Sequence, residues 1–517
     1  MKNPSDQALL ELKSKYGLEA LPVVLECKVE NIQASQIYKS LHLGEGSFIW
    51  ESSSTKERQA QTFSQYRSGR YSYIGACEEK IAYIAQNKTL IEDRSSESKW
   101  EFDTTGESLE ETLKELSYRD APSSSELQKY YQVILPPFIG GAFGFIGYDA
   151  ANYFEHIKGH SFHQSLPEVF IAQVSTLVAI DSIKGTVSII LWPTKKRSAS
   201  ECEILARDIQ EAIFSVASES PNDLSAKDSQ PVTYELSIPE NSFCSIVKKA
   251  KEYIRAGDIF QVVLSNALNI KGEFEPTRLH DTLKTQNPSP YHFLFQFKDS
   301  YYVGASPEVM LRSEPVFIPS AKEQGMKVIM RLVAGTYPID QDTQTVVEQA
   351  NKLIHDEKEK AEHIMLVDHA RNDIGKVARI GSVEVSDLFS VERYAHIHHI
   401  VSQVSGVLKP GCTVFSALKA CFPIATLTGT PKIRAMEIIA ELEGPSRGIF
   451  GGAVFFSGHD GLFDSAVAIR SAVINNDSAC VQVGAGIVHD SLPEREHQEC
   501  LLKARSMLNA LASCRKG

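Results

Sequence analysis

Two pairs of glutamates stand at helical spacing in the second half of the 517-residue chain. Glu359 and Glu362 are three residues apart, and so are Glu496 and Glu499, which places each pair on one face of a helix. Two such pairs facing each other would form an oxygen-rich site with open positions, the arrangement by which proteins usually hold Mg2+. From spacing alone, two solvated charged faces are the simpler interpretation.

A histidine-rich run lies between the two glutamate pairs, from Tyr394 to His399. On a strand, His396 and His398 point to the same side, which is one way to begin a transition-metal site. No cysteine or carboxylate triad completes such a site nearby. A single histidine acting as general acid or base is therefore the more economical interpretation.

Further residues suit an anionic ligand. Gly484, Ala485 and Gly486 carry backbone N–H groups that large side chains do not hinder and that can reach a carboxylate. Arg470 can grip a second carboxylate with its forked guanidinium. Each feature also has a structural interpretation, as turn glycines or as an arginine paired with a glutamate. Together they indicate a Mg2+-assisted enzyme that acts on a polycarboxylate.

The composition limits the classes of protein to consider. Hydrophobic residues make up 43% of the chain and charged residues 23%, the balance of a globular protein. No stretch approaches the roughly 18 apolar residues that span a bilayer, and residues 1–20 lack the apolar segment of a signal, so we expect a cytoplasmic protein without a membrane span. The net charge of -12 argues against nucleic acid as a ligand. The nine cysteines form no Cys-x-x-Cys pair and are expected to be free thiols.

The elements that must position these residues mix helices with antiparallel strands, so the predicted fold class is α+β. Helices are predicted over 200–216, 246–254 with a C-cap at Gly257, much of 342–377, and after Pro493. Strands are predicted over 72–75, 80–84, 170–181, 186–191, 259–264, 448–457, 462–474 and 479–488. Short turns at 184–185, 458–461 and 475–477 make neighbouring strands antiparallel.

Two segments bear on the organisation of the chain. The glycine-rich run 140–147 lacks the spacing of a phosphate loop and is expected to mark close sheet packing. The polar stretch 217–230 predicts a linker, which separates an N-terminal region, 1–230, from a second region, 240–517.

Several runs of the second region resemble the chorismate-utilising enzymes, and anthranilate synthase component I in particular. They are YIRAGDIFQVVLS (Tyr253–Ser265), NPSPY (Asn287–Tyr291), SPEVML (Ser306–Leu311), DEKEKAEHIMLVDHARNDIGKV (Asp356–Val377), TGTPKIRAMEII (Thr428–Ile439) and VQVGAGIV (Val481–Val488). In the first region, WESS (Trp50–Ser53) and GRYSYIG (Gly69–Gly75) resemble the tryptophan-sensing segment of that family.

The resemblance implies a two-part sandwich of antiparallel sheets with outer helices, and a cleft for chorismate in region 240–517. In such enzymes the residues that match Glu362 and Glu499 hold Mg2+, and those that match Glu359 and Glu496 support them. His399 matches the catalytic histidine, which protonates the departing C4 hydroxyl while ammonia attacks C2, and we place Thr426 beside it in the catalytic set. The residues implied to bind the substrate are Gly335, Thr336, Phe450, Arg470, Gly484, Ala485, Gly486 and Lys503.

The implied activity is that of an anthranilate synthase large subunit, a Mg2+-dependent lyase that opens tryptophan biosynthesis by converting chorismate and ammonia to anthranilate and pyruvate. Ala334 favours this activity, because aminodeoxychorismate synthases typically carry a nucleophilic lysine there. That synthase and a non-catalytic relative that binds tryptophan or chorismate are the alternatives. The sequence shows no glutaminase nucleophile, so ammonia is expected from a separate glutamine amidotransferase subunit.

Some positions depart from the usual residues of the family. His398 stands in place of a methionine, Tyr337 of an arginine, and Phe450 of a tyrosine near the pyruvyl group. Tryptophan is the expected inhibitor, and its implied site keeps three usual residues but has a histidine in place of methionine; the four are Ser52, Pro290, Tyr291 and His292.

Overall fold

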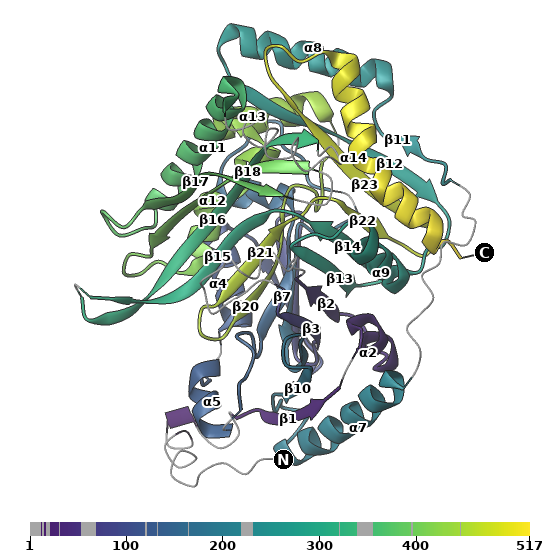
Figure 1. The fold of residues 1–517 in the computed structure, drawn as a ribbon, viewed down its shortest axis with the longest axis vertical. Helices are drawn as coiled ribbons and strands as arrows, with labels where there is room; N and C mark the ends of the chain where they lie inside the picture. The colour runs from purple at the N-terminus through teal and green to yellow at the C-terminus, as the bar shows by residue number, and fades with distance from the viewer. Residues whose placement is uncertain are drawn as a thin grey trace.

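Two large antiparallel sheets form the centre of the protein in a computed structural model, with helices on the outside (Figure 1). The structure describes residues 12, 15–16, 21–29, 31–52, 69–118, 121–131, 133–163, 165–218, 231–319, 321–338, 355–393, 397–444 and 446–516. This architecture confirms the predicted α+β sandwich. None of the helices in these ranges is long and apolar enough to cross a bilayer.

The first sheet has 12 strands. Its order is β1 (Val23–Lys28), β10 (Thr186–Leu191), β9 (Thr176–Asp181), β3 (Tyr71–Ala76), β2 (Phe48–Glu51), β13 (Tyr291–Phe297), β14 (Ser300–Ser306), β22 (Ser471–Ile474), β23 (Ser478–Ile487), β12 (Gln261–Lys271) and β11 (Glu235–Leu236), with β19 (Gly429–Thr430) paired to β12.

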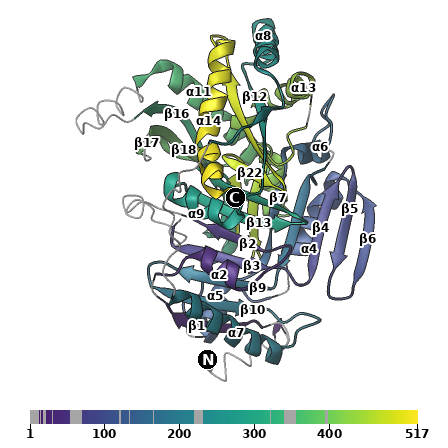
Figure 2. The same cartoon turned by 90° about the vertical axis from the view of Figure 1, so that its right-hand side faces the viewer.

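The second sheet has 11 strands, and its last three lie at one outer edge of the molecule (Figure 2). Its order is β17 (Glu384–Arg393), β18 (Ile397–Val407), β16 (Glu323–Pro338), β15 (Val309–Ile318), β21 (Phe463–Val467), β20 (Ala453–Gly458), β7 (Gly141–Ile146), β8 (Val169–Val174), β4 (Lys80–Ala85), β5 (Lys88–Asp93) and β6 (Ser98–Asp103). Both sheets combine strands from region 1–230 with strands from region 240–517. Residues 219–230 of the expected linker lie outside the described residues.

Two predicted strands each prove to be two strands that belong to different sheets. The run 170–181 breaks at Ser175, where the chain passes from β8 in the second sheet to β9 in the first. The run 462–474 breaks in the same way between β21 and β22. These crossings join the two sheets covalently, as at the corners of other sandwiches.

The predicted helices and turns are largely confirmed. The run 200–216 is α7 (Ala199–Ala217), and the helix before Gly257 is α8 (Glu240–Ala256), which Gly257 ends at φ 84°. The predicted helix after Pro493 is α14 (Pro493–Cys514), which buries Ala504, Met507 and Leu511. Of the predicted helical stretch 342–377, the structure describes α11 (Glu357–Gly375), and residues 342–354 lie outside the described ranges.

An aromatic layer fills the space between the sheets. Phe48 of the first sheet stacks on Phe143 of the second with ring centroids 4.0 Å apart, and Trp50 lies edge-on to Phe456 at 5.7 Å. The glycine-rich run supplies β7 in this layer. A Cβ on Gly144 would lie 2.0 Å from the carbonyl oxygen of Phe170, which confirms that these glycines serve close strand packing.

Replacing Gly144 with alanine should therefore lower the free energy of unfolding by about 1–3 kcal/mol, because β7 and β8 must move apart. Gly44→Ala is the matched control, since a Cβ there meets nothing within 4 Å, and it should leave stability nearly unchanged. Urea unfolding of both variants measures the difference. Equal midpoints would show that the sheet adapts to the extra methyl group.

Candidate active site

One cavity of about 610 Å³ lies between α11, α14 and the strands of both sheets. Both glutamate pairs reach it, from helices in the upper half of the molecule (Figure 1). The residues that line it and that enter the argument are Gln261, Val263, Glu308, Glu359, Glu362, Thr426, Phe450, Arg470, Gly484, Gly486, Arg495, Glu496, Glu499 and Lys503. The fold thus brings together the two glutamate pairs, which lie more than 130 residues apart in the sequence, about one cavity.

Helix geometry directs the glutamates into the cavity. Both α11 and α14 carry acidic residues in their first turn, where the helix dipole favours negative charge. His363 fixes α11 against the second sheet, because its Nε2 lies 2.6 Å from Oγ of Ser402 in β18. Burial lowers the pKa of His363 to about 4, so this contact is held by a neutral ring.

The donor set suits a hard cation. Carboxylate oxygens are the ligands that Mg2+ prefers, and the two pairs supply them from two helices. Among the described residues, no three acidic, histidine or cysteine side chains are gathered as a finished metal cluster. A cation bound here would draw side chains of α11 and α14 toward a common point.

Side chains of the cavity wall contact Glu499 and Glu362 through N–H groups. Lys503 lies 2.8 Å from Oε1 of Glu499, and its Nζ also donates to the carbonyl oxygen of Gly484 at 2.9 Å. The side-chain amide of Gln261 donates to Oε1 of Glu362 at 3.3 Å. The first contact joins two charges, and the second joins a charge to a neutral amide.

Arg470 lies where the chain passes from β21 to β22. Its φ of 49° is in the left-handed region, which is unusual for any residue but glycine. Such backbone strain persists only where the surrounding structure enforces it, and it concentrates at functional sites. Here it places a guanidinium-bearing residue in the wall of the cavity.

The glycines of β23 leave the backbone of this strand uncovered by side chains on the cavity side. Gly484 and Gly486 line it, whereas the alternating residue Ala485 is fully buried. A Cβ on Gly486 would lie 2.9 Å from Nε2 of Gln261. A side chain at position 486 would therefore displace the amide that contacts Glu362.

Glu308 is a site residue that the sequence interpretation missed. It is buried directly before β15, and Oγ1 of Thr426 donates to its Oε1 at 3.0 Å. Burial raises the pKa of Glu308 to about 7, although Thr426 and Arg470 act in the opposite direction. Its only sequence signal is its place in the SPEVML run, since a single glutamate has no spacing partner.

A buried ion pair holds two segments of the cavity wall in place. Arg447 and Glu443 lie 2.5 Å apart at the end of α13 (Lys432–Glu443) and just beyond it. The same guanidinium donates to the carbonyl oxygens of Val263 and Leu427, each at 2.6 Å. Leu427 ends the turn η3 (Ala425–Leu427), which carries Thr426, so one cation holds two walls of the cavity.

The remaining predicted site residues are described only in part. His399 lies in β18, where its backbone pairs with Thr336 of β16, and Gly335 lies in the same strand. The side chains of these residues lie outside the described ones, as does His396 altogether. Phe450 lines the cavity, with the guanidinium of Arg447 5.9 Å from its ring centroid.

A second, smaller cavity of about 50 Å³ adjoins two of the four residues implied to bind tryptophan, Ser52 and Tyr291. Ser52 lines it together with Trp50, Arg312 and Asp464. Tyr291 is buried behind these residues and donates its hydroxyl to Asp464 at 2.7 Å, and Pro290 and His292 are also buried. A cavity of this size has room for a few water molecules.

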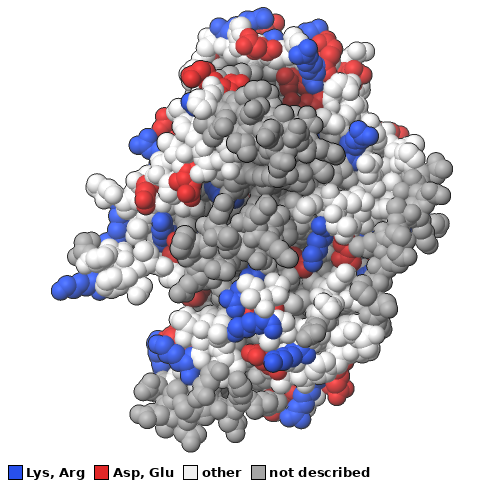
Figure 3. All heavy atoms as spheres, viewed as in Figure 1, with Lys and Arg blue, Asp and Glu red and all other residues white. Residues whose placement is uncertain are grey.

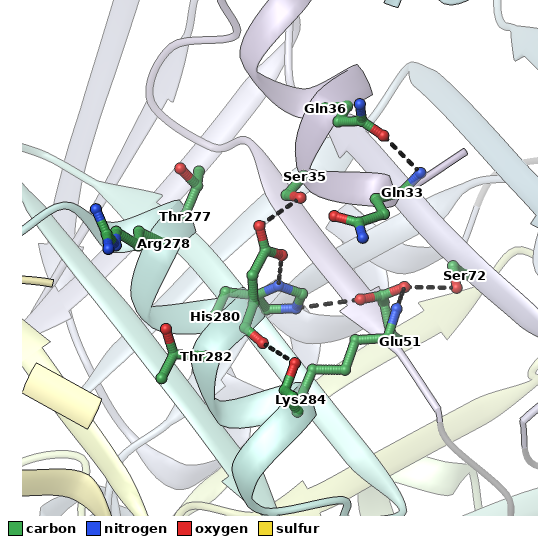
Figure 4. A network of polar contacts seen from close by, with 12 residues as sticks. Gln33, Ser35, Gln36, Glu51, Ser72, Thr277, Arg278, His280, Thr282 and Lys284 are labelled. Atoms are coloured by element: carbon green, nitrogen blue, oxygen red, sulfur yellow. Dashed lines mark hydrogen bonds and ion pairs between the residues drawn. The ribbon is translucent and has the colours of Figure 1, made fainter. Parts of the chain in front are cut away.

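A buried polar network surrounds Glu51, the residue between Trp50 and Ser52 in the chain (Figure 4). Glu51 accepts hydrogen bonds from Lys284 of α9 (Pro276–Gln286) and from Ser72, both at 2.9 Å, and lies 3.5 Å from His280. Burial opposes ionisation of Glu51, but Lys284 and His280 outweigh it and lower the pKa to about 2. His292 pairs with Glu51 across the strands and is held neutral by burial, which lowers its pKa to about 4.

The raised pKa of Glu308 predicts a pH-dependent stability. The unfolded chain loses this proton near pH 4.5 and the folded protein near pH 7, so the buried carboxyl disfavours folding increasingly as pH rises between the two values. Glu308→Gln should therefore gain stability relative to the natural protein by about 2–3 kcal/mol from pH 4.5 to pH 8. Urea unfolding at several pH values tests this, and a constant difference would mean that Glu308 titrates normally.

Comparisons with known proteins identify the family of this chain. Residues 55–509 match the family of chorismate binding enzymes. The chain is 32% identical over 500 residues to anthranilate synthase component 1 of Acetivibrio thermocellus, covering 95% of each protein, and 37% identical to that of Thermus thermophilus over 74% of this chain and 80% of the relative. The crystal structure of anthranilate synthase component I from Streptococcus pneumoniae TIGR4 matches 88% of this chain and 97% of its own, with a TM-score of 0.70 and 29% identity. The menaquinone-specific isochorismate synthase from Escherichia coli, at 17% identity and a TM-score of 0.66, shares the fold. The chain belongs to the chorismate-binding enzymes, and within them to the anthranilate synthase component I family.

Proposed function

We propose that this chain converts chorismate and ammonia to anthranilate, pyruvate and water, as the large subunit of an anthranilate synthase. The observation that carries the proposal is the single cavity into which two glutamate pairs, Arg470 and the buried Glu308 all face. The similarity to anthranilate synthase component 1 proteins over most of the chain supports the same reaction.

The cavity offers complementary groups for the two carboxylates of chorismate. Arg470 and the N–H groups near Gly484 and Gly486 suit the carboxylate of the enolpyruvyl side chain. Lys503, at the exposed side of the cavity, suits the ring carboxylate. Phe450 supplies an apolar wall without the hydroxyl that a tyrosine would add.

Glu362 and Glu499 would hold Mg2+, with Glu359 and Glu496 in support. Bound there, the ion would supply a positive charge for the ring carboxylate and for the electron density that shifts as the C4 hydroxyl leaves. The two helices contribute one ligand and one supporting glutamate each. His363 keeps α11 in the orientation that this requires.

Proton transfer falls to His399 and Glu308. The departing C4 hydroxyl needs a proton while ammonia attacks C2, and a base must then remove the C2 proton so that pyruvate leaves and the ring becomes aromatic. Because its pKa is about 7, Glu308 retains a proton over part of the neutral range and can act as a general acid. Thr426 orients this carboxyl through its hydrogen bond.

Partner, regulation and location are part of the same proposal. A separate glutamine amidotransferase subunit supplies ammonia, and tryptophan inhibits at the small cavity beside Ser52. With about 50 Å³ of space there, tryptophan needs its surrounding side chains to move apart, so inhibition is expected to be weak. A cytoplasmic location is supported by the nine cysteines, all of which are free thiols.

Purified chain incubated with chorismate, Mg2+ and an ammonium salt at alkaline pH should release anthranilate and pyruvate in equal amounts, and a chelator should abolish both. Chromatography with fluorescence detection measures the products. Aminodeoxychorismate as the product would refute the proposed reaction and indicate that Ala334 does not decide between the two activities.

Glu362→Gln and Glu499→Gln should each lower kcat/KM by 100-fold or more, an estimate of order ~3 kcal/mol for a lost charge at the reacting centre. Glu494→Gln removes the same charge from the exposed first turn of α14 and is the matched control. Steady-state rates with ammonia give the comparison. Similar losses in all three variants would indicate a general charge effect.

A further inference from the structure

The ammonium group of Lys503 lies between a carboxylate and a backbone carbonyl oxygen. Its Nζ lies 2.8 Å from Glu499 and donates to the carbonyl oxygen of Gly484, and all three residues line the catalytic cavity. Half of the Lys503 side chain and 46% of that of Glu499 are exposed. The ammonium group is thus held at the open side of the cavity, within reach of solvent.

The ion pair between Lys503 and Glu499 is weak enough for another ligand to replace it. It joins residues four apart on α14, with the glutamate on the N-terminal side, and such exposed helix pairs are weak. Gly484, the other partner, offers only a neutral carbonyl. Breaking these contacts therefore costs little.

A divalent cation on Glu499 changes this balance. Two cations that share one carboxylate repel each other, so a metal ion bound to Glu499 favours departure of the ammonium group. Gln261 makes a contrasting contact with Glu362, because its neutral amide neither competes for charge nor repels a cation. Of these two donors, a cation on Glu499 would therefore repel only Lys503.

We propose that Lys503 couples metal binding to substrate binding: the metal takes Glu499 from Lys503, and the released ammonium group binds a carboxylate of the substrate. This inference rests on the proposed metal site and goes beyond it, since it assigns to Lys503 a positioning role that is exchanged during the binding sequence. Coupling of this kind is reciprocal, so substrate must also strengthen metal binding.

Mn2+ binding followed by electron paramagnetic resonance tests the coupling without turnover, because Mn2+ suits the same carboxylate ligands. Without chorismate, Lys503→Met should bind Mn2+ about two- to five-fold more tightly than the natural chain, the range set by one exposed ion pair. With chorismate but no ammonium salt or glutamine, the strengthening of Mn2+ binding by substrate should be smaller in Lys503→Met by at least the same factor. Lys503→Arg, which keeps the cation, should behave like the natural chain.

Arg495→Met is the matched control, since Arg495 lines the same cavity and no ion pair joins it to Glu499 in the described structure. An equal gain in Mn2+ affinity in this variant would overturn the inference in favour of a general charge effect. So would unchanged or weaker Mn2+ binding by Lys503→Met. The metal site itself fails separately, if the natural chain binds no Mn2+ or if Glu362→Gln binds it equally well.

Discussion

The buried pair of Arg447 and Glu443 is the interaction on which the cavity walls depend. Arg447 is bound on one side to the carboxylate and on the other to backbone carbonyls of β12 and η3, while Glu443 also accepts a hydrogen bond from the backbone N–H of Ser265 at 2.6 Å. Removing one partner of a buried ion pair typically costs about 3–5 kcal/mol, because the other charge is left without compensation. The pair therefore fixes where Thr426 stands, and through Thr426 it fixes the carboxyl of Glu308.

Charge is distributed unevenly around this centre. The cavity concentrates glutamates, whereas the outer surface mixes both signs, as Figure 3 shows at the upper end of the molecule where α8, α13 and the start of α14 lie. The fold can hold the acidic cluster because the helices that carry it are fixed independently, by the neutral His363 on one side and by apolar burial of α14 on the other. These two helices are thus held in place by neutral and apolar contacts, and not by the acidic cluster that they carry.

Local patterns in the sequence predicted much of the fold but not the passage between sheets. Helices α7 and α8 follow from apolar periodicity and from Gly257, and the hairpin of β9 and β10 follows from its short turn. The break at Ser175 was not predictable, because only one residue separates the buried strands β8 and β9 and no glycine or proline marks a turn between them. Pairing of β2 with β13 joins segments far apart in the chain, and no local signal encodes it.

The candidate site was likewise predicted only in part from the sequence. Helical spacing indicated the glutamate pairs, but only the tertiary fold brings α11 and α14 to one cavity. Glu308 was missed because its raised pKa results from burial by segments far away in the chain, and a single acidic residue in a sequence gives no sign of such burial.

The sheets shared by both halves of the chain have a consequence for biosynthesis. Strand β2 cannot pair with β13, nor β7 with β20, until the ribosome has made the later strand, and β20 ends only at Gly458. While the ribosome makes the second half of the chain, these strands have unpaired edges, which favour aggregation, so we expect the nascent polypeptide to need protection until both sheets are complete.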